Sequence, residues 1–398
     1  MSPDHDEDSG DYWIRAINEP GMAESRHATV VVDNGWPRFL EAPASTTVET
    51  GRPFSMSVQA VGPGSLTYRW WHDGIEVPGL SGPDLVNEYA DALLDGTYEV
   101  EVRNAHGVVR SDPFVITVLP SSENDSAGFL LNTSLRGRSG QGAETMVTGF
   151  VLAGNGSVPV LVRGIGPGLR RFQVADAMDG AVQTLFRDGL EVASAATWTN
   201  PSSRALVESW SSLTGAFPLD PESHDTAMAL NLESGVYTVH LNDPSGSGVG
   251  LTEIYLVPDP DAQGALINLS TRMRLEEPDS SIIAGFVVSG DIPRWVLVRA
   301  VGPGLEAFDL IDVLSNPTLV LHRGDVEIAS NDDWEGINGD VDISAMTRIT
   351  TRVGAFALQT GSHDAALLIR LDPGVYTAQV GSADRGTGLV LVEVYAVP

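Results

Sequence analysis

Cysteine is absent from this chain of 398 residues. Disulfide bonds, thiolate zinc sites and cysteine nucleophiles are therefore excluded. Lysine is absent as well, so the 23 basic residues are all arginines, and 53 acidic residues bring the formal net charge to −30. Nucleic acid and anionic membranes repel such a chain, because binding to phosphate needs positive patches. The sequence predicts no nucleic-acid partner.

Long apolar runs are also missing. No stretch reaches the ~18 apolar residues that a transmembrane helix needs, so we expect no membrane insertion. The first residues, MSPDHDEDSG, are acidic and contain no apolar segment, so they do not form a signal peptide. What the chain does contain is 42 glycines and 24 prolines. This composition is typical of many turns between strands and predicts an all-β fold of tandem β-sandwiches.

An immunoglobulin-like pattern occupies residues 34–119. GRPFSMSVQA matches the second strand of such a domain, YRWWHDG matches the third with Trp70 in the core, and DALLDGTYEVEV places Tyr98 at the tyrosine corner. Val58 and Val100 stand at the usual cystine positions. The segment from about 37 to 118 resembles the immunoglobulin-like domains of bacterial surface proteins. The resemblance implies a sandwich in which apolar packing replaces the inter-sheet bridge.

A short repeat links this domain to the N-terminus. Residues 98–118 align without a gap with residues 12–32, at an offset of 86 (98 − 12). Each copy has a strand, a turn at Asn-x-x-Gly and a second strand. Because an isolated hairpin is marginally stable, we interpret residues 1–33 as the C-terminal hairpin of a truncated immunoglobulin-like domain. On this interpretation the chain is a fragment of a longer protein, and the missing signal peptide says nothing about export.

A longer repeat fills the rest of the chain. VLVRGIGPGL begins at residue 160 and returns as VLVRAVGPGL at residue 296, 136 positions later (296 − 160). The match extends over residues 125–258 and 262–398, which VPDPDAQG joins. Most of each copy has strand composition, and SSRALVESWSSL and DISAMTRITTRV each indicate one short helix. We predict two jelly-roll-like β-sandwich domains with one short helix each.

The two copies are similar to a β-rich repeat module of exported multidomain proteins from Verrucomicrobia and related bacteria. The matching segments include LINLSTRMRL, IIAGFVVSG, NDDWEG and GLVLVEVYAV. This resemblance implies a secreted or cell-surface location and neighbouring domains. It implies no chemical activity.

Each copy also carries one arginine within an apolar strand and one glutamate within its apolar last strand. The arginines are Arg163 and Arg299, and the glutamates are Glu253 and Glu393. Arginine keeps its charge in proteins, so a buried guanidinium needs a partner. We therefore predict structural, bidentate ion pairs between Arg163 and Glu253 and between Arg299 and Glu393.

Two repeated motifs look catalytic but lack what catalysis requires. Gly-Pro-Gly at residues 166–168 and 302–304 is not a phosphate loop, because the motif's lysine and hydroxyl residue are missing. Ser-His-Asp at residues 223–225 and 362–364 is not a catalytic triad, because neighbouring residues on a strand point to opposite faces. We interpret both motifs as turns and predict that the chain is not an enzyme.

An acidic loop, NDDWEGINGDVD, distinguishes the second copy. It concentrates Asp332, Asp333, Asp340 and Asp342, and carboxylate oxygens of this density can bind calcium. The spacing is not that of an EF-hand, and the first copy has AATWTNPSSR instead. A calcium site and a solvated acidic loop both remain open. Calcium is the one cofactor that the sequence leaves open.

Together these observations predict a non-catalytic structural or adhesive segment of a secreted or cell-surface multidomain protein. We expect a monomeric segment whose partner is a glycan or a protein of the cell surface or matrix. The alternative is a carbohydrate-binding accessory module of a larger extracellular enzyme. That function needs aromatic side chains on an exposed sheet face, and the candidates are Trp71, Trp210, Trp295 and a few tyrosines.

Overall fold

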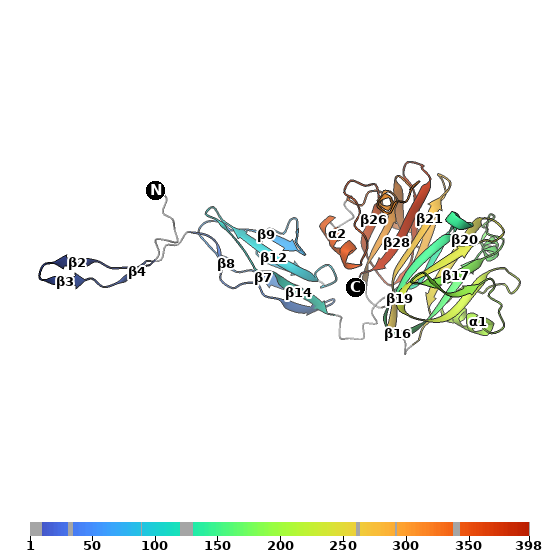
Figure 1. The fold of residues 1–398 in the computed structure, drawn as a ribbon, viewed down its shortest axis with the longest axis horizontal. Coiled ribbons are helices and arrows are strands. Elements are labelled where there is room, and N and C mark those ends of the chain that lie inside the picture. Colours follow the sequence, from blue (N-terminus) through green and yellow to red (C-terminus); the bar gives the residue numbers. More distant parts are fainter. Residues whose placement is uncertain are drawn as a thin grey trace. The chain divides into compact units, whose positions relative to one another are not determined.

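A computed structural model describes residues 10–30, 35–88, 90–119, 130–259, 263–290, 293–336 and 343–397. The chain forms two compact units, Met1–Ser122 and Glu123–Pro398. Strands make up most of both units, and the α-helices of the described residues are α1 (Arg204–Leu213) and α2 (Ile343–Arg352) (Figure 1). The all-β prediction is confirmed. The one short helix predicted for each copy of the long repeat is also confirmed.

The N-terminal segment is a two-part hairpin. It contains β1 (Gly10–Tyr12), β2 (Arg15–Asn18), β3 (Gly21–Glu24) and β4 (Ala28–Val30), with β1 paired to β4 and β2 to β3. Its register repeats that of the following domain: Gly10 pairs with Val30 just as Gly96 pairs with Ile116. Likewise, Arg15 pairs with Glu24 just as Glu101 pairs with Arg110. The segment therefore has the strand pairing of the last hairpin of an immunoglobulin-like domain.

The first domain is a sandwich of short strands. The strands are β5 (Arg38–Phe39), β6 (Thr46–Glu49), β7 (Phe54–Ser57), β8 (Ala60–Val61), β9 (Thr67–His72), β10 (Ile75–Glu76), β11 (Asp84–Asn87), β12 (Gly96–Arg103), β13 (Val108–Arg110) and β14 (Phe114–Leu119). One layer has the order β10-β9-β12-β14-β6, with β13 on β12, and the other contains the pairs β11-β7 and β5-β8. The pairing of β6 with β14 is parallel, whereas the pairings of β12 with β14 and with β9 in the same sheet are antiparallel.

The core of this domain is built as the sequence predicts. Trp70 is fully buried and donates its indole N–H to the carbonyl of Gly82 at 2.9 Å. Tyr98 donates its hydroxyl to the carbonyl of Leu94, four residues upstream, at 2.9 Å, which is the tyrosine corner. Val58 and Val100 lie in the same buried cluster. Apolar packing therefore fills the place where other members of this fold carry a disulfide.

The second unit contains both copies of the long repeat. The first copy contributes β15 (Leu130–Ser139), β16 (Met146–Ile165), β17 (Val182–Arg187), β18 (Leu190–Ala195), β19 (Thr226–Asn242) and β20 (Gly248–Leu256). The second contributes β21 (Gln263–Leu275), β22 (Ile282–Val288), β23 (Arg294–Val301), β24 (Pro317–Arg323), β25 (Val326–Asn331), β26 (Ala365–Leu371), β27 (Gly374–Ser382) and β28 (Gly388–Ala396). Short 3-10 helices η1 (Gly142–Glu144), η2 (Pro167–Phe172) and η3 (Pro303–Phe308) complete it.

The two copies exchange their first strands. β15 of the first copy lies between its own β20 and β22 of the second copy, and β21 of the second copy lies between its own β28 and β16 of the first. One layer therefore runs β18-β17-β19-β16-β21-β28-β23-β26. The other runs β25-β24-β27-β22-β15-β20-β16-β19, because the long strands β16 and β19 continue from one layer into the other.

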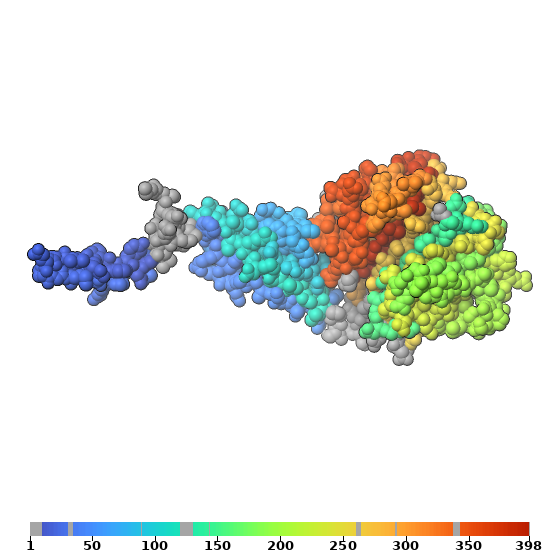
Figure 2. Space-filling model, viewed as in Figure 1, coloured from blue at the N-terminus to red at the C-terminus, as the bar shows by residue number. Residues whose placement is uncertain are grey.

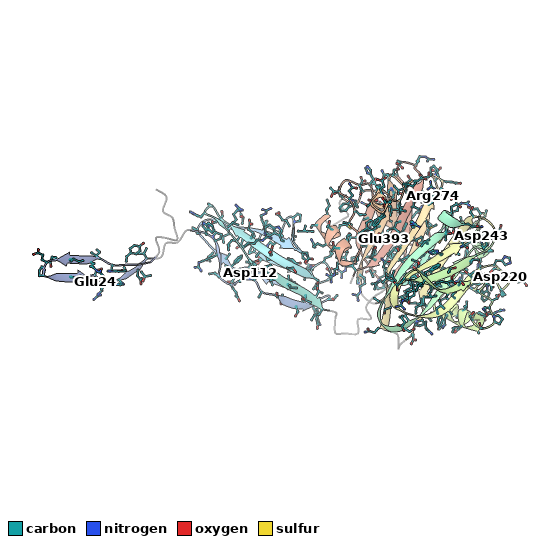
Figure 3. All side chains as sticks on the ribbon, viewed as in Figure 1. Glu24, Asp112, Asp220, Asp243, Arg274 and Glu393 are labelled. Carbon is teal, nitrogen blue, oxygen red and sulfur yellow. The ribbon has the colours of Figure 1, made fainter. Side chains whose placement is uncertain are left out.

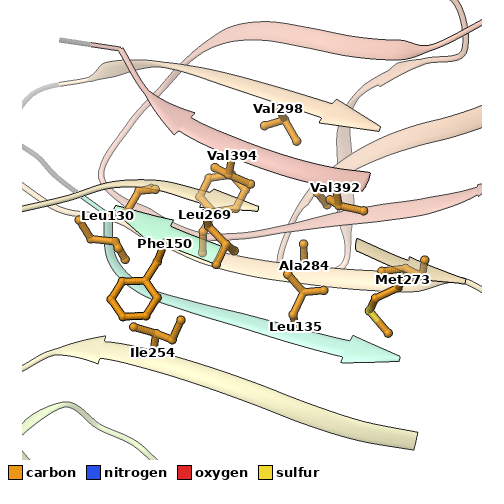
Figure 4. Close-up of a cluster of buried hydrophobic side chains, with 14 of the residues drawn as sticks. Leu130, Leu135, Phe150, Ile254, Leu269, Met273, Ala284, Val298, Val392 and Val394 are labelled. Carbon is orange, nitrogen blue, oxygen red and sulfur yellow. The ribbon is translucent and has the colours of Figure 1, made fainter. Parts of the chain in front are cut away.

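One large core is shared by both copies, beside two smaller clusters in the first copy. One cluster of buried residues draws on both copies, from Leu130 and Phe150 to Val392 and Val394 (Figure 4). The two layers are so close that a Cβ atom at Gly137 of β15 would lie 2.0 Å from Met273 Cε of β21. We expected two self-contained sandwiches at 125–258 and 262–398. The strand pairing instead makes one body from the two copies, which Figure 2 shows lying against each other (green and yellow against orange and red).

Candidate functional site

The structure brings each buried arginine next to the glutamate expected for it. Arg163 and Glu253 are directly paired residues on β16 and β20, and Arg163 Nε lies 3.1 Å from Glu253 Oε2. Arg299 and Glu393 hold the same positions on β23 and β28, with Arg299 Nη2 2.9 Å from Glu393 Oε2. Both guanidinium groups are fully buried. Figure 3 labels Glu393 within the sandwich.

The predicted bidentate geometry is wrong. Arg163 Nε lies close to the carboxylate, but neither Nε nor Nη2 makes a hydrogen bond, and Glu253 Oε2 accepts none. The other carboxylate oxygen, Oε1, accepts the hydroxyl of Tyr255 at 2.9 Å. A fork of two parallel bonds would need both oxygens, so the tyrosine changes the pair into a charge contact within a larger cluster.

Loop residues complete the cluster in both copies. Arg163 Nη1 donates to the carbonyl of Phe217 at 2.8 Å, and its guanidinium lies 4.3 Å from the centre of that ring. In the second copy Arg299 Nη1 donates to the carbonyl of Phe356 at 2.7 Å, and the guanidinium lies 4.4 Å from the centre of that ring. Sequence analysis missed Phe217 and Phe356, although both follow Gly-Ala in a repeated motif.

Burial dominates the electrostatics of this cluster. It raises the pKa of Glu253, and the guanidinium of Arg163 opposes that rise. Burial and the adjacent Glu253 carboxylate raise the pKa of Tyr255 above its ordinary value, and Tyr395 behaves in the same way beside Glu393. The cluster is closed to solvent, and its charges compensate each other although several of its polar atoms make no hydrogen bond.

The Gly-Pro-Gly and Ser-His-Asp motifs are two halves of one structural element. Asp225 is fully buried, and its Oδ1 accepts the amides of Gly166 and Gly168 at 2.8 and 3.1 Å. Asp364 does the same for Gly302 and Gly304 at 2.8 and 3.1 Å. The turn prediction stands for both motifs, but the sequence did not reveal that they are partners.

Glycine is required in this element because the aspartate approaches the backbone closely. A Cβ atom at Gly168 would lie 2.4 Å from Asp225 Oδ2, and one at Gly304 would lie 2.9 Å from Asp364 Oδ2. The histidine between serine and aspartate takes no part: His224 is exposed. A buried aspartate that is committed to backbone amides cannot orient a catalytic histidine, so the motif has no triad geometry.

The acidic loop lies only partly within the described residues. Asp340 and Asp342 fall outside them. Asp332 and Asp333 are exposed, and Asp333 Oδ1 lies 2.8 Å from Nδ1 of His363, a hydrogen bond that raises the pKa of this histidine. In the ranges that the structure covers, no group of three or more metal-ligating side chains comes together. The calcium site therefore stays a prediction.

The three tryptophans considered for glycan binding do not form an exposed row. Trp71 is half-buried on the outer face of its sheet, with Arg110 stacked 4.0 Å from the ring centre and Arg69 at 5.5 Å. Trp210 is half-buried against the cluster under α1, and Trp295 is half-buried and has contacts of its own. These rings serve packing.

Described residues of the second unit line two hollows that are large enough for a small ligand. One, of about 610 Å³, is mainly apolar and lies beside α1, where Trp198, Val207 and Phe217 line it. The other, of about 420 Å³, is mainly polar and lies where β15 and η2 of the first copy meet the turn between β21 and β22. It is lined from the first copy by Arg136, Arg138 and Phe172, and from the second by Glu276, Ser280 and Ser281.

Fold and sites together define an all-β chain with an immunoglobulin-like domain and a two-copy β-sandwich that contains buried ion pairs. No family model matches the chain. It is 32% identical over 114 residues to smooth-muscle myosin light chain kinase of Gallus gallus and 29% identical over 129 residues to the muscle M-line assembly protein unc-89 of Caenorhabditis elegans. These matches cover 25% and 32% of this chain but span only 6% and 2% of those proteins.

Solved structures similar to this chain contain immunoglobulin domains. The complex of titin M10 with obscurin-like 1 has 22% identity and a TM-score of 0.20, covering 22% of this chain and 96% of that one. The four N-terminal immunoglobulin domains of Dscam1 have 26% identity and a TM-score of 0.19, covering 28% of each chain. Among the described residues, no helix combines the length and apolar character that crossing a membrane requires.

Proposed function

We propose that this chain is a non-catalytic structural and adhesive segment of a secreted or cell-surface multidomain protein, which transmits tension between its neighbours. The observation that carries the proposal is the placement of the strands through which the chain enters and leaves each unit. The resemblance of residues 125–398 to a module of exported bacterial proteins supports the location. The similarity to the muscle M-line assembly protein unc-89 supports a structural role.

In the immunoglobulin-like domain the second strand is a direct neighbour of the last, whereas the short first strand, β5, pairs with β8 in the other layer. β6, near the N-terminus of the domain, pairs in parallel with β14 at its C-terminus, from Thr46–Ile116 to Glu49–Leu119. Because the two strands run in the same direction, tension on the two ends pulls them past each other. All their hydrogen bonds then share the load, whereas an antiparallel terminal pair would open one bond at a time.

In the second unit the entry and exit strands lie inside the layers. β15 has β20 on one side and β22 on the other, and β28 has β21 and β23. Neither end strand can be pulled out of its layer without breaking its hydrogen bonds to both neighbouring strands. Each end strand also ties one copy to the other, directly or through its neighbour. Tension therefore loads both copies together.

Stretching the whole chain by its two ends in a single-molecule force experiment tests the mechanical part of this proposal. At ~3.6 Å per residue, the immunoglobulin-like domain should release about 30 nm and the second unit about 95 nm in one step. Thr47→Pro, in β6, should lower the force of the 30-nm step. Val86→Pro, on the exposed edge strand β11, is the control and should not. The mechanical role is contradicted if the control variant weakens the step and Thr47→Pro leaves it unchanged.

The location has its own test. Antibodies against this chain should label intact, unpermeabilised cells of the source organism, or should detect the protein in the culture medium. Labelling that appears only after permeabilisation would rule out the secreted or surface location and would leave the mechanical result untouched.

A further inference from the structure

Three arginines and three carboxylates line the polar hollow of about 420 Å³, so an arginine is available there only where local pairing leaves one without a partner. The arginines are Arg136, Arg138 and Arg274, and the carboxylates are Asp176, Glu276 and Glu277. Two of its arginines are neutralised: Arg138 contacts Asp176 at 2.9 Å and Glu276 at 3.0 Å, and Arg274, labelled in Figure 3, contacts Asp312 at 2.5 Å. Arg136 is exposed and has no acidic partner among the described residues. The net charge of −30 repels anions at long range, so an anion is held here only by direct contact with an unpaired guanidinium such as that of Arg136.

An exposed aromatic ring lies in the same hollow. Phe172 is 51% exposed, and its ring is held edge-on by Phe217 with ring centres 5.1 Å apart. Ser280, Ser281 and Gln173 also line the hollow, and the hydroxyl of Ser280 donates to the carbonyl of Glu277 at 2.7 Å. The hollow thus combines a flat apolar surface, a cation and several hydrogen-bonding groups. It suits a ligand that has an apolar face, hydroxyl groups and a carboxylate.

The duplication supplies an internal comparison. The second copy keeps an exposed arginine and an exposed phenylalanine at the corresponding positions, Arg272 and Phe308, whereas the neighbouring Arg170 and Arg171 correspond to Glu306 and Ala307. The exposed pair thus persists where adjacent surface residues have changed. Gln173, however, corresponds to Asp309, whose negative charge would repel a carboxylate. The first copy therefore carries the better anion site.

We propose that this hollow binds an acidic saccharide, with Arg136 holding the carboxylate of a uronic acid residue and Phe172 supporting the sugar ring. A guanidinium matches a carboxylate in shape and charge. Ser280 and Ser281 stand within the same hollow to hydrogen-bond the ring hydroxyls. The proposal rests on the surface location proposed above and gives the adhesive role a ligand class.

Calorimetric titration of the whole chain with trigalacturonic acid tests the proposal. We expect binding that Arg136→Gln weakens about ten- to hundredfold, the range for loss of one hydrogen-bonded charge. Phe172→Ala should weaken it as well, and added salt should weaken it because the site is open to solvent. Arg26→Gln is the matched control: Arg26 is an exposed arginine of the other unit without an acidic partner among the described residues, and its loss should change nothing.

Three results would overturn the proposal: no heat of binding to trigalacturonic acid, equal binding by the Arg136→Gln variant, or equally tight binding of polyglutamate, which would make the hollow a general site for acidic peptides. The methyl-esterified trisaccharide should bind at least tenfold more weakly, since it lacks the charge that Arg136 recognises. None of these results would alter the force measurements, so failure of the ligand assignment is distinguishable from failure of the structural function.

Discussion

Gln183 is a buried amide that the fold does not satisfy. It lies on β17, is fully buried, and both its amide nitrogen and its amide oxygen lack a hydrogen-bond partner. Its counterpart in the second copy, at an offset of 136 (319 − 183), is Leu319, which is also fully buried. The two sites have nearly the same backbone pairing, since Gln183 faces Leu241 and Leu319 faces Val380. The second copy thus shows which residue the site accepts.

We predict that Gln183→Leu stabilises the second unit. An unsatisfied buried amide costs about 1–3 kcal/mol, and leucine of similar size removes that cost without leaving a cavity. For a unit of this size, 1 kcal/mol corresponds to roughly 2 °C, so the melting temperature should rise by about 2–6 °C. The reverse change, Leu319→Gln, should lower the free energy of unfolding by about 3–5 kcal/mol, because it adds the amide and removes apolar burial.

Differential scanning calorimetry of the whole chain measures both changes. The transition of the immunoglobulin-like domain serves as the internal reference, because neither residue lies in it. A melting temperature that stays constant or falls in the Gln183→Leu variant would refute the reasoning, and would mean that the amide has favourable interactions that geometry does not reveal.

Two further changes test the buried polar groups. Glu253→Gln leaves the charge of Arg163 buried without compensation and should destabilise the second unit by about 3–5 kcal/mol in urea denaturation. Adding Arg163→Met to this variant should restore part of the lost stability. A double variant no more stable than the single variant would contradict this prediction. Asp225→Ala frees the buried amides of the Gly-Pro-Gly turn and should cost about 2–4 kcal/mol, while His224→Ala, at an exposed position, should stay within about 0.5 kcal/mol. Equal losses for Asp225→Ala and His224→Ala in the same urea titration would show that the histidine has a role of its own.

The ion pairs could be predicted from the sequence because a charged side chain in an apolar strand can be stabilised in only a few ways. A guanidinium that stays ionised must find a carboxylate, and each copy has one glutamate in a comparable strand. The rest of the cluster could not be predicted in this way. Phe217 contributes its backbone carbonyl, which every residue possesses, and its position depends on the path of a loop. Tyr255 was within reach, since each copy places a tyrosine two residues after the glutamate.

The partnership of Asp225 with the Gly-Pro-Gly turn illustrates a different limit. Both motifs are visible in both copies, and each was correctly interpreted as a turn. Their connection is long-range, because Asp225 and Gly166 are 59 positions apart (225 − 166). Local periodicity carries no information about such a contact. One signal was available: a motif that repeats only together with another motif is a candidate for contact with it.

The exchange of first strands could not have been read from the sequence at all, and the reason is energetic. Within its own copy or in the other, a first strand would meet the same kind of surface: Gly285 faces Ser134 across the copies, just as Gly149 faces Ser270. The backbone hydrogen bonds available in the two arrangements are therefore similar. The two arrangements differ in how the chain connects the strands. Swapping of equivalent elements is a low-cost route to association. In a single chain the linker keeps the copies together at high effective concentration, so the exchange converts two similar domains into one body with one core. Tension, heat or mutation in either copy then acts on both.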